Sequence, residues 1–202
     1  MQRFEDLLRG FARFRTKHWA EPRFRDLVEH GQQPAMLAIG CSDSRVDLAL
    51  LFDTAPGDLF TIRNVANIVP PHAPDAKLHG VSSAIEFAVT QLKVRHVVVV
   101  GHSGCGGIRA LVEGRPLDTT LYLDRWVHIA EDALRGLPDG TLAERCTACE
   151  RANVALSIER LRTFPFVAEA LAAGTLSLHG LWVDLPGGRL HRLGTDGWDE
   201  AG

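Results

Sequence analysis

The sequence predicts an α/β protein with a mainly parallel central β-sheet flanked by helices. Three short apolar segments, at residues 35–40, 58–63 and 96–101, are typical of buried strands. The third is the most distinctive, because four consecutive valines follow His96 and such β-branched runs suit a strand that is buried on both faces. Helical patterns lie between and after these segments, and this alternation favours parallel strands connected by helices.

The remaining elements follow from hydrophobic spacing and from turn residues. The expected helices of the core are residues 46–52, 80–92, 108–113, 121–134 and 142–164. Pro165 ends the last of them, because proline cannot continue a helix that precedes it. A further strand is expected at residues 176–183, before the turn formed by Pro186, Gly187 and Gly188.

An amphipathic helix is predicted over the first eighteen residues. Its apolar side chains at helical spacing are Phe4, Leu7, Leu8, Phe11 and Phe14. Such a stripe packs either on the core of its own chain or on a partner subunit, and the spacing alone leaves both open. We expect one domain over residues 1–202, with residues 1–30 as an N-terminal helical arm packing on a partner and residues 31–202 as the α/β core.

Length, charge and cysteine content exclude several classes of protein. A chain of 202 residues fits one domain, and a formal charge of −3 argues against nucleic acid or an anionic membrane as the partner. No apolar run approaches the length of a membrane span, and the charged N-terminus is unlike an export signal. We therefore expect a cytoplasmic protein, in which four cysteines are more suited to metal binding or chemistry than to a disulfide scaffold.

Three potential metal ligands follow two of the predicted strands. Cys41 directly follows the first strand, His102 directly follows the third, and Cys105 comes three residues later. Because sites in parallel sheets collect at the carboxyl ends of the strands, these side chains are expected to meet. Two thiolates and an imidazole suit zinc, and three protein ligands leave a coordination position open for catalysis. The alternative is two buried cysteines and a hydrogen-bonded histidine with no metal.

A carboxylate and a guanidinium lie next to the first of these cysteines. Asp43 and Arg45 are two residues apart, so they cannot face each other on a helix, but they can pair in a loop. A bidentate pair would orient the carboxylate toward water on the metal. The alternative is an ordinary surface ion pair.

Three motifs together resemble the β-class carbonic anhydrases. They are Cys41-Ser-Asp-Ser-Arg45, the segment from Pro56 to Asn67, and Gly101-His-Ser-Gly-Cys-Gly-Gly107. The resemblance covers residues 5–193 and is strongest to the plant-type branch, through segments around Cys146 and Thr163. It implies zinc on Cys41, His102 and Cys105, with Asp43 and Arg45 as the catalytic dyad. By position it also implies a substrate pocket with Gln32 reaching into the neighbouring subunit, together with Phe60, Val65, Gly106 and Phe87. Phe87 stands where many members of the branch have a tyrosine.

The resemblance also implies an activity and an assembly. The activity is zinc-dependent reversible hydration of carbon dioxide to bicarbonate, with one zinc per subunit, in a homo-oligomer that is a dimer or a dimer of dimers. Two alternatives stay open. One is hydrolysis of carbon disulfide or carbonyl sulfide on the same zinc site. The other is a non-enzymatic zinc or bicarbonate sensor, which has no need for an oriented Asp–Arg pair.

Cys146 and Cys149 form a second cysteine pair. Both fall on one face of the predicted helix 142–164, whereas redox pairs of this spacing lie at a helix N-terminus after a strand. We expect them to be small core residues.

Overall fold

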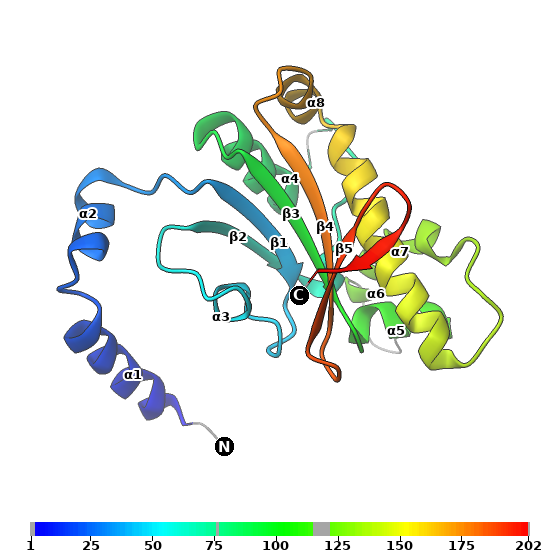
Figure 1. Cartoon of the computed structure of the whole chain (residues 1–202), viewed down its shortest axis with the longest axis horizontal. Helices are drawn as coiled ribbons and strands as arrows, with labels where there is room; N and C mark the ends of the chain where they lie inside the picture. Colours follow the sequence, from blue (N-terminus) through cyan, green and yellow to red (C-terminus); the bar gives the residue numbers. More distant parts are fainter. Residues whose placement is uncertain (1–2, 76, 115–121, 202) are drawn as a thin grey trace.

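A single twisted sheet organises the core of the chain, as Figure 1 shows for the computed structural model. The structure describes residues 3–75, 77–114 and 122–201. The strands are β1 (Met36–Cys41), β2 (Leu59–Asn64), β3 (His96–His102), β4 (Ser177–Asp184), β5 (Arg189–Leu193) and β6 (Trp198–Glu200). Their order in the sheet is β2-β1-β3-β4-β5-β6, and the pairs β2–β1, β1–β3 and β3–β4 are parallel. The predicted mainly parallel α/β class is confirmed, with an antiparallel extension through β5 and β6.

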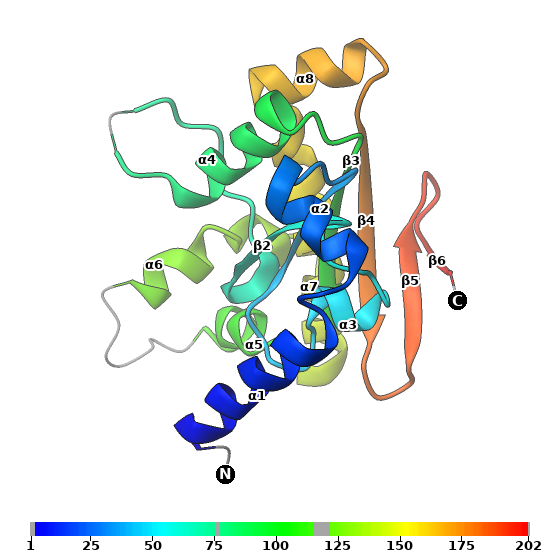
Figure 2. The same ribbon diagram turned by 90° about the vertical axis from the view of Figure 1, so that its left-hand side faces the viewer.

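Helices connect the strands and cover mainly one face of the sheet (Figure 2). The α-helices are α1 (Phe4–Lys17), α2 (Pro22–His30), α3 (Leu48–Leu51), α4 (Gly80–Glu86), α5 (Gly106–Glu113), α6 (Leu123–His128), α7 (Leu142–Arg162) and α8 (Pro165–Ala172). Two 3₁₀ turns, η1 (Val65–Asn67) and η3 (Glu131–Leu134), and a π-helical segment, η2 (Phe87–Gln91), complete the described elements. No described helix has the length and apolar character that crossing a membrane needs.

The main core lies between the sheet and helices α4, α7 and α8. Alternate strand residues such as Leu37, Ile39 and Val97 pack against these helices and are fully buried. Close packing of α7 on the sheet depends on Gly101, since a Cβ atom there would lie 2.6 Å from Cγ2 of Val154. The opposite face of the sheet has a smaller cluster around α3.

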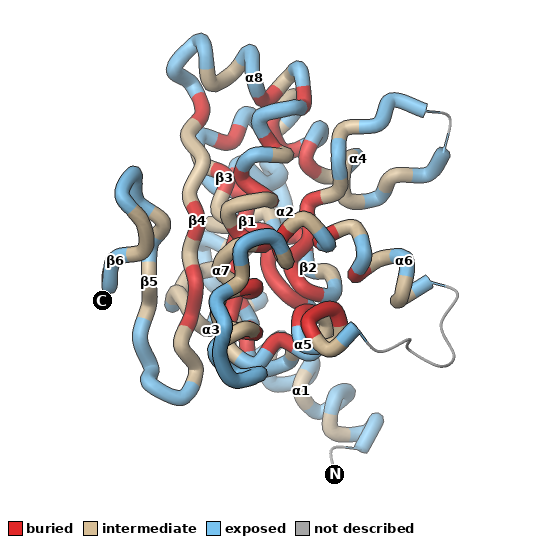
Figure 3. The backbone as a smooth tube through the Cα atoms, turned by 90° about the vertical axis from the view of Figure 1, so that its right-hand side faces the viewer, coloured by how far each residue is buried: buried red, intermediate tan, exposed pale blue. Residues whose placement is uncertain are grey.

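The arm formed by α1 and α2 extends away from the core (Figures 1 and 3). Neither helix buries a residue. The two helices are joined by aromatic contacts among Phe14, Trp19 and Phe24, whose ring centroids lie 5.2–6.3 Å apart. The predicted N-terminal helix is therefore confirmed over its described residues, while its packing on a partner stays a prediction.

Several element boundaries differ from the sequence prediction. The predicted helix 80–92 is α-helical only to Glu86 and then widens into the π-helical segment η2. The predicted helix 121–134 is divided into α6 and η3, and residue 121 lies outside the described residues. Helix 46–52 is limited to α3. The sequence analysis did not predict α2, α8, β5 or β6 as separate elements.

The second cysteine pair lies in the core, as expected. Cys146 and Cys149 are buried on α7 within a hydrophobic cluster that also contains Cys41 and Cys105. Burial raises the pKa of both thiols, and that of Cys149 reaches about 12. Such inert thiols fit a packing role.

Candidate metal centre

The ends of β1 and β3 bring three ligand-type side chains together. Cys41 and His102 are the last residues of these adjacent parallel strands, and Cys105 is the N-cap of α5. All three are buried, and their ligand atoms lie within 4.8 Å of one another. The prediction that these distant residues meet at the carboxyl edge of the sheet is confirmed.

The spacing and chemistry of this cluster fit zinc. Two sulfurs on a tetrahedral zinc ion lie about 3.8 Å apart, given Zn–S bonds of about 2.3 Å. The Sγ atoms of Cys41 and Cys105 are 4.0 Å apart. Their contact lowers the pKa of Cys41, which favours a thiolate at this position. No further His, Cys, Asp or Glu of the described residues belongs to this group.

The hydrogen bonding of His102 leaves one of its ring nitrogens available to a cation. Its Nδ1 lies 3.0 Å from the carbonyl oxygen of Ser103, and because a carbonyl can only accept, Nδ1 carries the proton. The other ring nitrogen, Nε2, therefore presents a lone pair, and this buried atom has no hydrogen-bond partner in the described part of the chain. A buried unpaired nitrogen is costly unless a ligand satisfies it, which a cation would do.

The carboxylate of Glu150 holds the backbone of Cys105. This buried residue on α7 accepts a hydrogen bond from Cys105 N–H at 3.0 Å and from Trp182 Nε1–H at 3.2 Å. Burial raises the pKa of its carboxyl. The sequence analysis missed Glu150, because neither partner is near it in sequence.

Asp43 and Arg45 form the bidentate pair that the loop position predicted. Arg45 Nε donates to Asp43 Oδ1 at 2.9 Å and Arg45 Nη2 donates to Oδ2 at 2.7 Å. The backbone N–H of Arg45 also donates to Oδ1, at 2.9 Å. This guanidinium holds the pKa of Asp43 well below its usual range, so the carboxylate is ionised. Nη2 of Arg45 also donates to the carbonyl of Gly104 at 3.1 Å, which ties the pair to the loop that carries Cys105.

A second arginine, also missed from the sequence, fixes the backbone of this loop. Arg63 lies near the end of β2, and its guanidinium donates to the carbonyl oxygens of Cys41 at 3.0 Å and Asp43 at 2.7 Å. The available signal was its position one residue before the end of a strand that neighbours β1. Arg63 therefore fixes the strand end from which the pair projects.

The five predicted pocket residues divide into two groups. Val65 lies near the loop that carries Cys105, since a Cβ atom at Gly107 would be 2.9 Å from Cγ1 of Val65. A Cβ atom at Gly106 would meet open space. Phe60 instead pairs in register with Leu37, four residues before Cys41, or about 13 Å along the strand. Phe87 packs on Phe60 at 5.8 Å between ring centroids, and Gln32 is exposed after α2. Within one chain, the structure does not bring these three to the metal ligands.

Fold and site together define an α/β protein with a cluster of two cysteines and one histidine that could hold a metal at the carboxyl edge of its sheet. Residues 36–190 match the family model described as carbonic anhydrase. A carbonic anhydrase of Pseudomonas aeruginosa is 40% identical over 193 residues, covering 93% of this chain and 86% of that protein. A chloroplastic β carbonic anhydrase of Arabidopsis thaliana is 34% identical over 88% of this chain, which spans 60% of that protein.

Solved structures agree with this assignment. The β-carbonic anhydrase CcaA is 30% identical and superposes with a TM-score of 0.89 over 98% of both chains. A β-carbonic anhydrase of Sordaria macrospora, described as tetrameric, is 32% identical with a TM-score of 0.80 over 98% of both chains. The chain belongs to the β class of the carbonic anhydrase family, whose members are enzymes.

Proposed function

We propose that this chain catalyses the reversible hydration of carbon dioxide to bicarbonate and a proton, with one zinc ion held by Cys41, His102 and Cys105. The observation that carries the proposal is the convergence of two thiols and an unpaired imidazole nitrogen beside an oriented carboxylate. When bound, zinc supplies the Lewis acidity that makes water a nucleophile near neutral pH.

Asp43 is the proposed orienting group for the attacking water. A carboxylate offers about four lone-pair positions, two on each oxygen. Arg45 occupies two on Oδ1 and one on Oδ2, which leaves Oδ2 one free position. That position can accept one O–H of the attacking water and thereby turn the lone pair of its oxygen toward the carbon of carbon dioxide. Because the ionised carboxylate cannot donate, it also selects a protonated oxygen of bicarbonate in the reverse reaction.

The substitution Asp43→Asn tests this role without removing a metal ligand. We expect turnover of carbon dioxide to fall about 100- to 1,000-fold, the range typical of losing one aligned hydrogen-bonding group, while zinc content stays at one per chain. Asp53→Asn is the matched control, since Asp53 is exposed beyond α3. Stopped-flow assays with carbon dioxide and with carbon disulfide separate the proposed activity from the alternative hydrolase. Full hydration activity in Asp43→Asn would remove the aspartate from the mechanism.

We also propose that the active unit is a two-fold dimer in which the arm packs on a second copy. Phe4, Leu7, Leu8 and Phe11 are each more than half exposed on α1, with no core of their own to cover them. Burying such a face is favourable, and an isologous interface lets each copy cover the other. A relative described as tetrameric supports a homo-oligomer.

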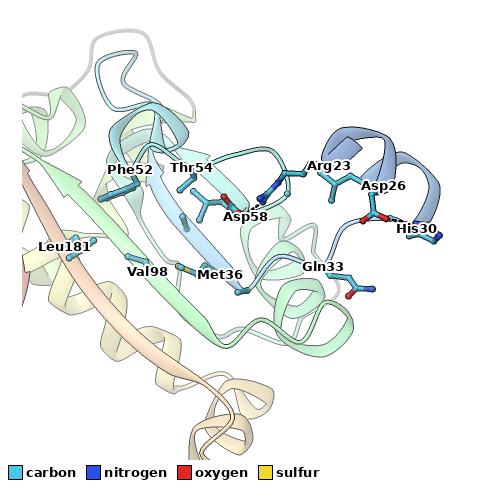
Figure 4. Close-up of a pocket in the computed structure, with 16 residues that line it drawn as sticks. Arg23, Asp26, His30, Gln33, Met36, Phe52, Thr54, Asp58, Val98 and Leu181 are labelled. Atoms are coloured by element: carbon cyan, nitrogen blue, oxygen red, sulfur yellow. Dashed lines mark hydrogen bonds and ion pairs between the residues drawn. The ribbon is translucent and has the colours of Figure 1, made fainter. Parts of the chain in front are cut away.

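We propose that helix α1 of the partner binds in a groove of about 990 Å³ between α2 and the sheet (Figure 4). Its floor is apolar, formed by side chains such as Met36, Val98 and Leu181, while Asp26 lies at the α2 side. An apolar floor complements the apolar residues that α1 carries on one face.

The same assembly accounts for the pocket residues that lie away from the metal ligands of their own chain. Phe87 and Gln32 are exposed, and Phe60 packs directly on Phe87. We propose that these three line the partner's substrate pocket, whereas Val65 and Gly106 line the chain's own.

Replacing Phe4 and Phe11 by aspartate tests the dimer. We expect sedimentation to give a monomer and hydration activity to be lost, since each site would lack its partner's residues. Arg15→Ala, on a charged position of the same helix, should change neither. A fully active monomer in dilute solution would contradict the proposal.

A cytoplasmic location, as expected from the sequence, stays a proposal supported by four free cysteines.

A further inference from the structure

Two histidines on adjacent strands lie together at the other end of the sheet from Cys41, His102 and Cys105. His96 begins β3, and His179 is the third residue of β4. His96 pairs in register with Ser177, and side chains two apart on a strand point to the same face, so His96, Ser177 and His179 share one face. His96 is six residues before His102 on β3, or about 20 Å along the strand.

The nitrogens of these two imidazoles converge. His96 Nδ1 and His179 Nε2 are 3.3 Å apart, and the hydroxyl oxygen of Ser177 lies 2.7 Å from the first and 3.0 Å from the second. All three side chains are half-buried.

The spacing matches that of two histidine ligands on one metal ion. With metal–nitrogen bonds of about 2.0–2.1 Å at a tetrahedral angle, two ligand nitrogens lie about 3.3–3.4 Å apart. An imidazole extends about 1.2 Å from ring centre to nitrogen, so the ring centres on such an ion would lie about 5.2 Å apart. The observed centroid separation of His96 and His179 is 5.4 Å, with 48° between the ring planes.

We propose that His96 and His179 form a second metal site, which takes a divalent late-transition cation such as Ni²⁺ or Zn²⁺, with water completing the coordination. Imidazole is a preferred ligand of these ions. The cation would replace the hydrogen bonds that Ser177 makes to the two rings. The Ser177 hydroxyl has another acceptor, the carbonyl oxygen of Arg95 at 3.3 Å, so it stays partnered when the rings turn to the metal.

Charges around the pair set its expected affinity. Burial, His96 and Arg192 together lower the pKa of His179, which keeps its ring neutral and able to ligate. Arg192 lies on β5 opposite Leu181, and its charge opposes a cation nearby. The site is therefore weaker than one with a carboxylate ligand, and removing the Arg192 charge should strengthen it.

Four other described histidines differ in kind, since each offers one imidazole and one carboxylate within a helical turn or a short loop. These pairs are His18 with Glu21, His30 with Asp26, His79 with Asp75, and His128 with Asp124. They provide matched controls for weak binding to a single surface histidine.

Nickel binding by the zinc-loaded, full-length chain without a histidine tag tests the proposal, because nickel and zinc are counted separately by elemental analysis after equilibrium dialysis. We expect one nickel per chain with zinc unchanged. His96→Ala and His179→Gln should each weaken nickel binding at least tenfold, Arg192→Gln should strengthen it severalfold, and His30→Ala should leave it unchanged. The glutamine can still hydrogen-bond to Ser177, which preserves the fold, and far-UV circular dichroism checks this.

Three results would overturn the second site. The first is no nickel bound to the wild-type chain. The second is nickel binding by the His96→Ala and His179→Gln variants equal to that of the wild-type chain. The third is nickel gained only as zinc is lost. The last result would assign nickel to the cysteine–histidine cluster instead.

Discussion

Substitution of Glu150 tests directly how the fold holds the loop that carries Cys105. Replacing it by leucine, which has a similar shape, removes the acceptor of two buried N–H groups, those of Cys105 and Trp182. Each buried donor left without a partner costs about 1–3 kcal/mol, so the loss is about 2–6 kcal/mol. The leucine also removes a buried carboxylate, whose desolvation opposes folding, so we expect a value near 2–4 kcal/mol. Glu150→Gln keeps one acceptor oxygen and should lose about half as much.

The assay is urea unfolding of the metal-free chain at fixed concentration, followed by far-UV circular dichroism. Because the Cys105 backbone would lose its anchor, zinc should also leave Glu150→Leu faster in the presence of a chelator. Glu169→Gln, an exposed glutamate of α8, is the control and should shift the free energy of unfolding by less than about 0.5 kcal/mol. An unfolding free energy of Glu150→Leu equal to that of the control would refute the reasoning, since the two N–H groups would then have found other partners.

Three further substitutions test other parts of the molecule. Gly101→Ala places a methyl group against Val154, and we expect overpacking to lower the unfolding free energy by about 1–3 kcal/mol in the same urea assay. Arg45→Lys replaces a two-pronged donor by a single ammonium, so Asp43 is free to rotate. Stopped-flow hydration rates should fall at least tenfold while elemental analysis finds zinc unchanged. Thr141→Ala removes the capping box at the start of α7 and should cost about 1 kcal/mol, measured by thermal unfolding. Wild-type behaviour in any of these variants would contradict the contact on which its prediction rests.

Much of the fold and the metal cluster could be predicted from sequence, for a local reason. The valine run of β3 and the shorter apolar run of β1 identify buried strands by composition, and parallel strands bring their carboxyl ends to one edge. The positions of Cys41 and His102 at those ends therefore follow without any long-range information. The sequence analysis treated Pro165 only as the end of the preceding helix and so missed α8. Pro165 is also the first residue of α8, a position that proline favours.

The supporting contacts were beyond sequence reasoning because they join residues that are distant along the chain. In the sequence, Glu150 does not differ from the other charged residues of its helix. Its role depends on a loop 45 residues away. Arg63 likewise acts on backbone carbonyls 20 and 22 residues before it. Hydrophobic periodicity reports which face of an element is buried, and it contains no information about which backbone groups a buried polar side chain will satisfy.

The hydrogen bonds from Arg45 to both Asp43 and Gly104 have a consequence for a substrate with only three atoms. Even the most efficient small ligands gain about 1.5 kcal/mol per atom on binding, so carbon dioxide can supply at most about 4–5 kcal/mol. That is too little to reshape a protein loop in every catalytic cycle. An enzyme for such a molecule must hold its geometry in advance, and a clamp that fastens the carboxylate to the ligand loop before the gas arrives meets that demand.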